Sequence, residues 1–584
     1  MSNIVEEKPV SVADSEIYAY HRLSKHTVES LFSRGTGLDW SNQPDPFLTY
    51  SGTDVIELPL DFVVSSRSIF ETISESICEF YGGDEKSALE SGLEIEPGGL
   101  GFLSNLLYYA TAISAWKQIK GTDHKWALRV NASSGNLHPT ETYLLLREDF
   151  ATDLAGGFYH YRVDRHHLER LSREDLLSPI WQALELKRKS PPLLICLGSV
   201  IWREVWKYKQ RGYRYCQHDL GHALAALSLS AQALGWRIKS YGLFPDAELS
   251  CFLGMEEELV EPLLLMALCP GDRSLIDETT PDKDGKKSDW TNRITEIDGR
   301  VNQISSSVKS YPEIVKAHGV TSYSQKEFDL VVAGLADLDL ASRGRQRLPG
   351  AILDQDQARK LSVNLFDVNR DYVHKSVHET IRKRRSAVDM DGATSISVEH
   401  LEAILTFSTG GFHADFQSPD RFEYLKRVEA CGFHMIHLYL YIHRVEGLLS
   451  GLYYFDRFKQ ELIPLLLQDQ KEIARSVSCF QDIAADGAFA LSMVADMEMG
   501  FALFGQRFYR LVHFEAGFIG QLLYLNACAL GYDSTGIGCF LDDAINEYLS
   551  LSPGFEVIYN FTFGKAVLDL RLTTLKSYAF PEPI

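Results

Sequence analysis

The stretch HDLGHALAALSLSAQALG at residues 218–235 returns further along the chain as FEAGFIGQLLYLNACALG at residues 514–531. Apolar residues recur in both stretches at the spacing of one face of an α-helix, and a glycine ends each stretch as a helix C-cap does. Many other positions hold Ala, Ser or Gly, which allow a neighbouring backbone to come close. Gly221 and Gly517 stand 296 positions apart, as do Gly235 and Gly531. The pattern predicts one closely packed helix that occurs twice.

Further matches extend the repeat beyond this helix. GGFYHY at residues 156–161 returns as SGLYYF at residues 450–455, an offset of 294 positions, and both aromatic runs are typical of strands. His138 and Tyr143 match His434 and Tyr439 at an offset of 296. Matches in one order at nearly one offset indicate two copies of the same unit. Because strands and helices are both present without regular βαβ alternation, we expect each copy to be α+β.

Length and composition limit the architecture and the compartment. The 584 residues exceed what one hydrophobic core supports, so we assign residues 1–275 to an N-terminal domain, 276–350 to a polar connecting segment and 351–584 to a C-terminal domain. The net charge of −21 argues against a general nucleic-acid or membrane-surface binder. No apolar run reaches the roughly 20 residues of a bilayer span. Nine cysteines without a CxxC pair and an N-terminus without an apolar signal core predict a reducing, cytoplasmic compartment.

Small and polar residues precede a predicted strand of the first copy. Within RVNASSGNLHPTETYLLL at residues 129–146, they are Ser133, Ser134, Gly135 and Asn136. These residue types bond to their own backbone and tolerate turns, so a simple loop explains the composition. A loop that cradles a ligand explains it equally well, and the stretch alone leaves both interpretations open.

Together these blocks resemble the nitroreductase superfamily, and specifically the SagB-type (McbC-like) flavin dehydrogenases. The resemblance is carried in the first half by ASSGNLHPTETY, GFYHY and KYKQRGYRYCQHDLGH, and in the second half by RKRRSAV, FEAGFIGQLLYLNACALG and GIGCFLDD. It implies an α+β sandwich that dimerises with FMN in the interface. For this chain it implies two tandem nitroreductase-like domains that form an intramolecular pseudo-dimer. Enzymes of this type oxidise azoline rings to azoles in peptide natural products.

The resemblance assigns three groups of residues to FMN. The phosphate clamp of the family matches Arg384, Arg385 and Ser386. The backbone contact along the flavin matches Gly536, Ile537 and Gly538. A closing phosphate contact matches Lys565 and Arg571. Guanidinium groups and a hydroxyl suit a phosphate, and glycine lets a ring approach the backbone. Judged from the residues alone, a solvated basic helix, a turn and an ordinary surface charge remain open for the three groups.

In the family, the loop that matches residues 133–136 reaches across the interface to the flavin of the other unit. Ala132 stands where the family usually has Pro, but the hydrogen-bonding groups of the loop are kept. At an offset of 296, its polar residues fall on Glu429, Ala430 and Gly432, and the clamp falls on Ala88, Leu89 and Glu90. The first copy therefore keeps the loop and the second keeps the clamp. We expect one composite FMN site between the halves and a degenerate second pseudo-site.

Lys207 and Tyr208 match the Lys-Tyr pair that acts in azoline oxidation in the family. The resemblance implies that Lys207 is the base and that Tyr208 holds the substrate or relays the proton. A lysine serves as a base only where burial or neighbouring cations lower its pKa, and we expect Arg211 and Arg214 to contribute to this. In the second copy the pair becomes Leu503-Phe504, which keeps the bulk and loses both functional groups.

These features predict an FMN-dependent dehydrogenase or oxidase. Its substrate would be an azoline-type ring, or a related bond, in a peptide or carrier-tethered intermediate, with dioxygen as electron acceptor and a biosynthetic enzyme as a possible partner. An NAD(P)H-driven reductase of nitro, quinone or ene substrates and a flavin-free scaffold remain alternatives. We expect no metal site, because His218 and His222 lack the Glu of HExxH and a third ligand. We also expect no nucleic-acid or membrane partner, and either a monomeric pseudo-dimer or a homodimer.

Overall fold

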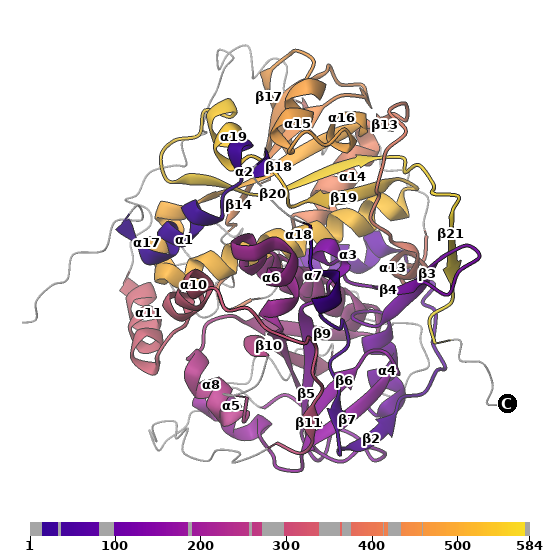
Figure 1. The fold of residues 1–584 in the computed structure, drawn as a ribbon, viewed down its shortest axis with the longest axis vertical. Coiled ribbons are helices and arrows are strands. Elements are labelled where there is room, and N and C mark those ends of the chain that lie inside the picture. Colours follow the sequence, from indigo (N-terminus) through magenta and orange to yellow (C-terminus); the bar gives the residue numbers. More distant parts are fainter. Residues whose placement is uncertain are drawn as a thin grey trace, which may run out of the picture.

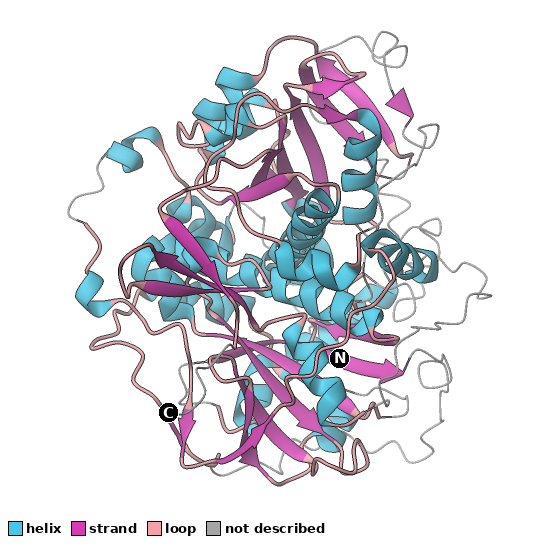
Figure 2. Cartoon of the chain, turned by 90° about the vertical axis from the view of Figure 1, so that its right-hand side faces the viewer, coloured by secondary structure: helices cyan, strands magenta, loops and turns pink. Residues whose placement is uncertain are grey.

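The computed structural model describes residues 14–32, 37–80, 98–184, 190–255, 260–270, 297–337, 363–364, 375–410, 412, 414–417, 434–457 and 459–578. Two seven-stranded antiparallel sheets form its two ends (Figure 1). Most elements of the first half lie in the lower part of the molecule in Figure 1 and most of the second half in the upper part, whereas the first helices, α1 (Glu16–Ser24) and α2 (Val28–Phe32), lie among the elements of the second half. The view in Figure 2 shows the helices packed between these two groups of strands.

The two sheets repeat one strand order. The first sheet contains, side by side, β2 (Asp54–Glu57), β7 (His167–Ser172), β6 (Gly157–Arg162), β5 (Thr140–Leu146), β8 (Leu193–Ser199), β10 (Glu261–Pro270) and β9 (Trp236–Tyr241). The second contains β12 (Val363–Asn364), β17 (Glu461–Leu466), β16 (Gly451–Asp456), β14 (Ile436–Ile442), β18 (Phe489–Asp496), β20 (Phe555–Gly564) and β19 (Asp533–Ile537). The aromatic runs predicted as strands are confirmed as β6 and β16. The central strands β5 and β14 are buried along their whole length, in agreement with the apolar and aromatic residues of β14 and of the second part of β5.

The repeated stretch forms the two long helices at the centre, α7 (Gly212–Ala233) and α18 (Phe508–Ala529). They cross at Gly221 and Gly517. A Cβ atom on Gly221 would lie 2.9 Å from the Cα atom of Gly517 and would overlap the carbonyl oxygen of Phe514. Both glycines are required because the two backbones touch, as the small residues of the repeat predicted.

Two buried ion-pair clusters join the halves reciprocally. Arg211 and Arg214 of the first half bind Asp542 at distances of 2.8 and 2.6 Å. Arg507 and Arg510 of the second half, 296 positions after these arginines, bind Asp246 of the first half, 296 positions before Asp542, both at 2.6 Å. The aspartates begin the helices α19 (Asp542–Tyr548) and α8 (Asp246–Phe252). The two halves therefore share a pseudo-symmetric interface.

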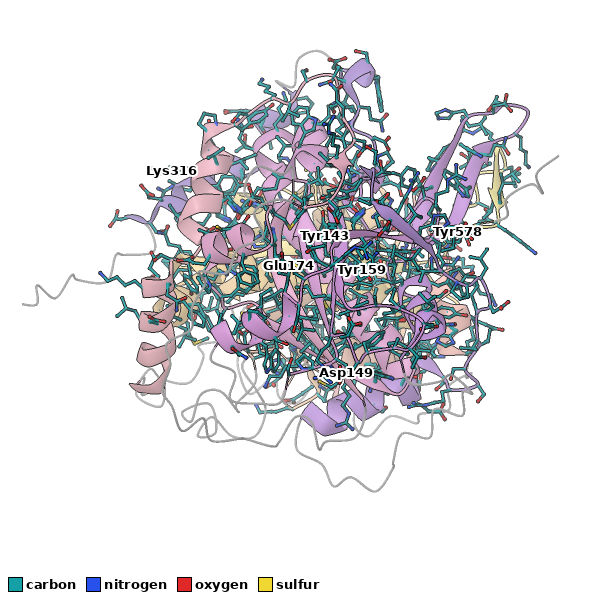
Figure 3. All side chains as sticks on the ribbon, turned by 90° about the horizontal axis from the view of Figure 1, so that it is seen from below. Tyr143, Asp149, Tyr159, Glu174, Lys316 and Tyr578 are labelled. Atoms are coloured by element: carbon teal, nitrogen blue, oxygen red, sulfur yellow. The ribbon has the colours of Figure 1, made fainter. Side chains whose placement is uncertain are left out.

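The first and the last described segments of the chain each pack on the opposite half. Near the C-terminus, β21 (Leu572–Leu575) pairs with β3 (Ile113–Ile119), which pairs with β4 (Lys125–Arg129). Tyr578, labelled beside these strands in Figure 3, accepts from the amide of Ile113 and donates to the carbonyl of Val163. After α1 (Glu16–Ser24), Lys25 pairs with Asp543 at 2.7 Å. Each half thus carries a terminal segment that completes the other.

The remaining elements cover the sheets and connect the halves. In chain order they are α2 (Val28–Phe32), β1 (Tyr50–Ser51), α3 (Ile69–Phe80), α4 (Leu100–Tyr108), α5 (Leu177–Ala183), α6 (Ile201–Tyr208), β11 (Arg300–Val301), α10 (Pro312–Thr321), α11 (Gln325–Asp337), α13 (Val377–Lys383), β13 (Ile396–Ser397), α14 (Val398–Ser408), β15 (Val445–Glu446), α15 (Lys471–Val477), α16 (Ile483–Asp486) and α17 (Met497–Phe504). Part of the predicted connecting segment therefore folds, because β11, α10 and α11 lie within it. The bounds of the three assigned segments stay a prediction. None of the helices in the described residues has the length and apolar character needed to cross a membrane.

Candidate active site

The serine-rich loop lies between the two long helices. It forms a short 3-10 turn over residues 134–136 just before β5. The backbone amide and the hydroxyl of Ser134 both donate to the carboxylate of Asp219 on α7, at 3.0 Å. The amide of Ala132 donates to the side chain of Gln521 on α18, also at 3.0 Å. The loop is therefore held by helices from both halves.

The predicted catalytic pair lies directly against this loop. Gly135 has a φ of +58°, and a Cβ atom placed on it would lie 2.5 Å from the hydroxyl of Tyr208 and 2.9 Å from Nζ of Lys207. Only glycine leaves room for both groups in this backbone conformation. The structure thus brings together the loop and the Lys-Tyr pair, which are about 70 positions apart in the sequence.

Burial, and not a neighbouring cation, lowers the pKa of Lys207. The prediction that Arg211 and Arg214 have this effect is wrong, because both arginines are buried against Asp542. The one charged neighbour that acts on Lys207 is Glu204, one helical turn earlier on α6, and it raises the pKa of the lysine. Loss of solvent around the ammonium is thus the physical cause of the lowered pKa of Lys207.

Two buried carboxyl groups beside Lys207 were not predicted from the sequence. Burial raises the pKa of Asp219 to about 7 and raises the pKa of Glu204 well above its ordinary value. Glu204 is fully buried, and neither of its oxygens has a hydrogen-bond partner among the described residues. The one feature of the sequence that could have pointed to Glu204 and Asp219 is that each is an acidic residue in a helix that is otherwise buried. Glu204 interacts electrostatically with both Asp219 and Lys207, so its protonation is coupled to theirs.

The arginine of the predicted clamp reaches the backbone that precedes the loop. Arg384 follows α13, and its guanidinium donates to the carbonyls of Val130, at 3.1 Å, and Arg129, at 3.2 Å. Arg384 is 4% exposed, so it does not belong to a solvated basic helix face, which was the alternative interpretation of the clamp. The clamp of the second half and the loop segment of the first half therefore meet in space.

A cluster of cations without a carboxylate partner surrounds this contact. It consists of Arg382, Arg384 and Arg385 from the second half and Lys117 from β3 of the first half. Burial is the largest cause of the lowered pKa of each, and for Arg385, whose pKa falls to about 10, the neighbouring arginines add to it. Within the described part of the chain, none of the four forms an ion pair, and the one carboxylate that acts on the cluster is that of Asp569, which raises the pKa of Lys117. We call this group the cationic cluster; it has the composition of a phosphate site.

The glycines of the second half lie between the cationic cluster and the catalytic pair. The hydroxyl of Tyr524 accepts from the amide of Gly536, at 2.7 Å, and from the hydroxyl of Ser386, at 3.0 Å. A Cβ atom on Gly538 would lie 2.6 Å from the ring of Tyr215, which in turn packs edge-on against Tyr208. A continuous line of contacts thus runs from the clamp through residues 536–538 to the catalytic pair.

Other predicted residues have different surroundings. The side chain of Asn136 stabilises its own loop through Ala127 and His138. Lys565 donates to the carbonyl of Gly531 at 2.9 Å, and Arg571 is exposed and paired with Asp569. No described contact joins Lys565 or Arg571 to the cationic cluster by its side chain, so their role at a phosphate stays a prediction.

Comparisons with known proteins agree with this geometry. Residues 381–565 match the model of the Nitroreductase family. The matched residues all lie in the second half. Over the whole chain, a candidate nitroreductase from Anabaena variabilis matches in structure with a TM-score of 0.67 and 22% identity, covering 95% of this chain and 100% of its own. The likeness shows that the nitroreductase-like α+β fold, as expected, extends over both halves.

Two relatives match part of the sequence. A candidate nitroreductase from Methanocaldococcus jannaschii is 27% identical over 166 residues, which are 28% of this chain and 77% of the relative. The trifolitoxin-processing protein TfxB of Rhizobium leguminosarum bv. trifolii is 30% identical over 162 residues, which are 26% of this chain and 41% of the relative. The match with TfxB therefore spans less than half of that protein.

The counterpart of the site, on the other side of the pseudo-symmetric interface, is filled by the chain itself. Gly242, which matches Gly538, and Leu243 donate their amides to the carboxylate of Asp415, at 2.9 and 3.2 Å. The ring of the buried Phe416 packs against Gly242. Glu515, the counterpart of Asp219, is paired with Arg457 at 3.0 Å. The counterparts predicted at positions 429–432 and 88–90 lie outside the described residues.

Proposed function

We propose that the chain is an FMN-dependent oxidoreductase with one composite active site, built from both halves. The cationic cluster carries this proposal. It gathers four cations without a described carboxylate partner, three from one half and one from the other, next to the line of contacts that ends at Lys207. A phosphate would supply the missing negative charge, and the residues present therefore fit the phosphate end of FMN.

The substrate we propose is an azoline-type ring, or a related bond, in a peptide or carrier-tethered intermediate. The Lys-Tyr pair inside a SagB-like block supports this chemistry, and the name of TfxB refers to the processing of a peptide. The dehydrogenation removes one proton and one hydride from the ring. FMN, when bound, supplies the hydride acceptor, and dioxygen is the proposed final oxidant.

Lys207 is placed to take the proton. Burial lowers the pKa of Lys207, so a neutral amine is available at a lower pH than for a solvated lysine. The hydroxyl of Tyr208 lies on the same side of Gly135 and can hold the substrate or pass the proton on. The raised pKa of Glu204 favours its protonated form near this amine, which limits the negative charge that would stabilise the ammonium.

Turnover of a synthetic peptide with one thiazoline ring tests this proposal. We expect Lys207→Met to keep its FMN and to lose about 10²–10⁴-fold in kcat. Lys209→Met is the matched control, because Lys209 is exposed two residues later, and it should stay within about twofold of the wild type.

Full thiazoline turnover by Lys207→Met would contradict the assignment of the base. If NADPH bleached the flavin without dioxygen and a nitro or quinone compound reoxidised it, while no thiazoline reacted, the protein would be a reductase. A chain that binds no FMN would be a scaffold.

A further inference from the structure

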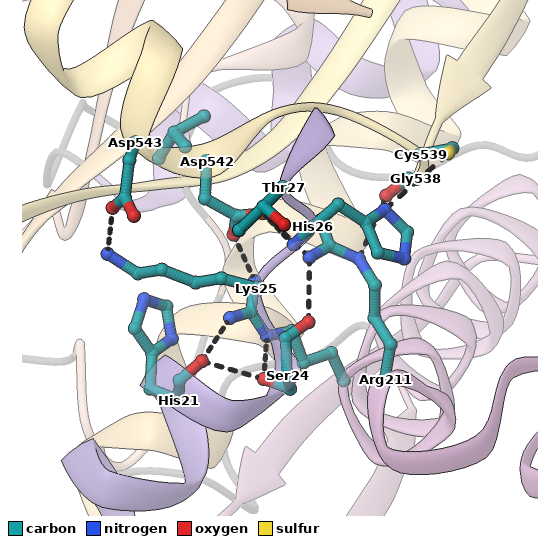
Figure 4. Close-up of polar contacts among 12 residues, drawn as sticks. His21, Ser24, Lys25, His26, Thr27, Arg211, Gly538, Cys539, Asp542 and Asp543 are labelled. Carbon is teal, nitrogen blue, oxygen red and sulfur yellow. Dashed lines mark hydrogen bonds and ion pairs between the residues drawn. The ribbon is translucent and has the colours of Figure 1, made fainter. Parts of the chain in front are cut away.

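Three metal-binding side chains from distant parts of the sequence meet beside residues 536–538. His26, Cys479 and Cys539 each offer one donor atom, and these atoms all lie within 4.8 Å of one another. Sγ of Cys539 is 2.8 Å from Sγ of Cys479 and 3.5 Å from Nδ1 of His26. Figure 4 shows the ring of His26 directed at Cys539, which directly follows Gly538. The active site proposed above uses none of these three side chains.

The backbones that carry the three side chains are bonded to one another. His26 forms a parallel bridge with Leu541, and the amide of His26 donates to Asp542 at 3.0 Å. The amide of Leu541 donates to the carbonyl of Val477 at 2.8 Å. The positions of the three donors are therefore set by the frame of the fold, as in a preorganised site.

The turn that presents Cys479 has an unusual conformation. Cys479 and Phe480 have φ values of +54° and +60°, which non-glycine residues rarely adopt. The side chain of Gln481 fixes this turn by donating to the carbonyl of Ser478, at 2.8 Å, and to that of Cys539, at 3.1 Å. Strained residues of this kind cluster at functional sites.

We propose that His26, Cys479 and Cys539 bind one thiophilic divalent cation, with zinc as the preferred ion and one coordination position left open. Two thiolates neutralise the charge of the ion, and a Cys₂His set suits zinc. On a tetrahedral zinc, with bonds of about 2.3 Å to sulfur and 2.0 Å to nitrogen, a thiolate and an imidazole nitrogen lie roughly 3.5 Å apart, as Cys539 and His26 do. The two sulfur atoms would move apart by about 1 Å to reach the same geometry.

The ion would tie the N-terminal segment of the first half to the second half. His26 follows α1, whereas Cys479 and Cys539 belong to loops around the second sheet. No two of these three ligands are close in the sequence, so no spacing pattern points to the site. The proposal is independent of the bound flavin, and its test does not use catalysis.

Metal binding is measured on the full-length chain with its thiols kept reduced. Zinc is quantified in protein purified without chelator, and cobalt is then titrated into chelator-treated protein. We expect one zinc per chain and one cobalt with a thiolate-to-cobalt charge-transfer band. Cys479→Ser and Cys539→Ser should each lower the cobalt affinity by at least about 100-fold. Cys528→Ser, at a half-exposed cysteine outside the cluster, should keep it.

Three results would overturn the proposal. One is a wild-type chain that binds neither zinc nor cobalt with a thiolate band. Another is a Cys528→Ser chain that loses as much affinity as Cys539→Ser. The third is a disulfide between Cys479 and Cys539 in protein alkylated at lysis, which would show a thiol–disulfide pair instead. The wild-type cobalt spectrum decides the proposal even if a variant does not fold.

Discussion

Gly135 is the single residue that sets how close the loop comes to the catalytic pair. We expect Gly135→Ala to displace Lys207 and Tyr208 and to lower kcat at least tenfold, because its Cβ atom would lie 2.5 Å from the tyrosine hydroxyl. Gly121 is the control, since its φ is +78° but no atom lies within 4 Å of a Cβ built there. Gly121→Ala therefore carries the backbone strain without the collision. Steady-state kinetics of both variants checks this, and equal losses would disprove a steric cause.

Asp219 gives a second residue-scale prediction, on pH. Burial raises the pKa of Asp219 to about 7 from an ordinary value of 3.8. Between these values the folded chain holds a proton that the unfolded chain has released, so the free energy of unfolding falls as the pH rises. One proton contributes a slope of at most about 1.4 kcal/mol per pH unit.

Asp219→Asn removes this titrating group. We expect the free energy of unfolding of the FMN-free variant to fall less steeply than that of the wild type between about pH 4 and pH 7. Urea denaturation at several pH values gives both slopes. If the two slopes coincide, the folded-state pKa of Asp219 is not raised.

At the scale of elements, the crossing of α7 and α18 joins the two halves. Gly221→Ala should push the helices apart, because its Cβ atom would meet the backbone of Gly517 and Phe514. We expect a loss of about 1–3 kcal/mol in the free energy of unfolding, or more. Gly319→Ala in α10 is the control, since nothing lies within 4 Å of its Cβ and alanine favours the helix by roughly 0.5–1 kcal/mol. Opposite signs for the two variants in denaturant titrations confirm the prediction, and a stable Gly221→Ala chain refutes it.

The elements that could be predicted from the sequence are those set by local pattern. Helical spacing and small residues predicted α7 and α18, and alternating aromatic runs predicted β6 and β16. These elements need only a periodicity or a motif. The family resemblance assigned roles to the loop and to the Lys-Tyr pair without predicting that they touch, so the contacts around Gly135 come from the structure alone.

What the sequence could not predict depends on distant packing. Glu204 looks like any charged helix residue, and only the contacts of α6 with other elements bury it. His26 and Cys539 are more than 500 positions apart, so no spacing pattern links them. The sequence also could not predict that each terminal segment packs on the other half, because β21 is a short strand and pairs with the distant β3 of the first half.

At the scale of the whole molecule, buried charges tie the halves together. Asp542 is completely buried and binds Arg211 and Arg214. We expect Asp542→Asn to cost about 3–5 kcal/mol, because it leaves two buried guanidinium groups without their counter-ion. The next residue supplies the control: Asp543 is exposed and pairs with Lys25, so Asp543→Asn should cost less than about 1 kcal/mol. Thermal and denaturant unfolding of both variants tests this, and similar costs would rule out an interface held by buried ion pairs.

The same interface brings the cationic cluster and the loop together, and it leaves the counterpart region filled by Asp415 and Phe416. A pseudo-symmetric molecule with two sheets would therefore bind a single cofactor. Arg384 and Lys117, one from each half, should both contribute to its affinity. Lys383, exposed and paired with Glu379, should not.

Equilibrium titration of the cofactor-free chain with FMN decides whether one site is shared between the halves. We expect one FMN per chain, with an affinity that Arg384→Gln and Lys117→Gln each lower at least tenfold and that Lys383→Gln leaves unchanged. Two FMN per chain, or an affinity that depends on only one of the halves, would contradict a shared site.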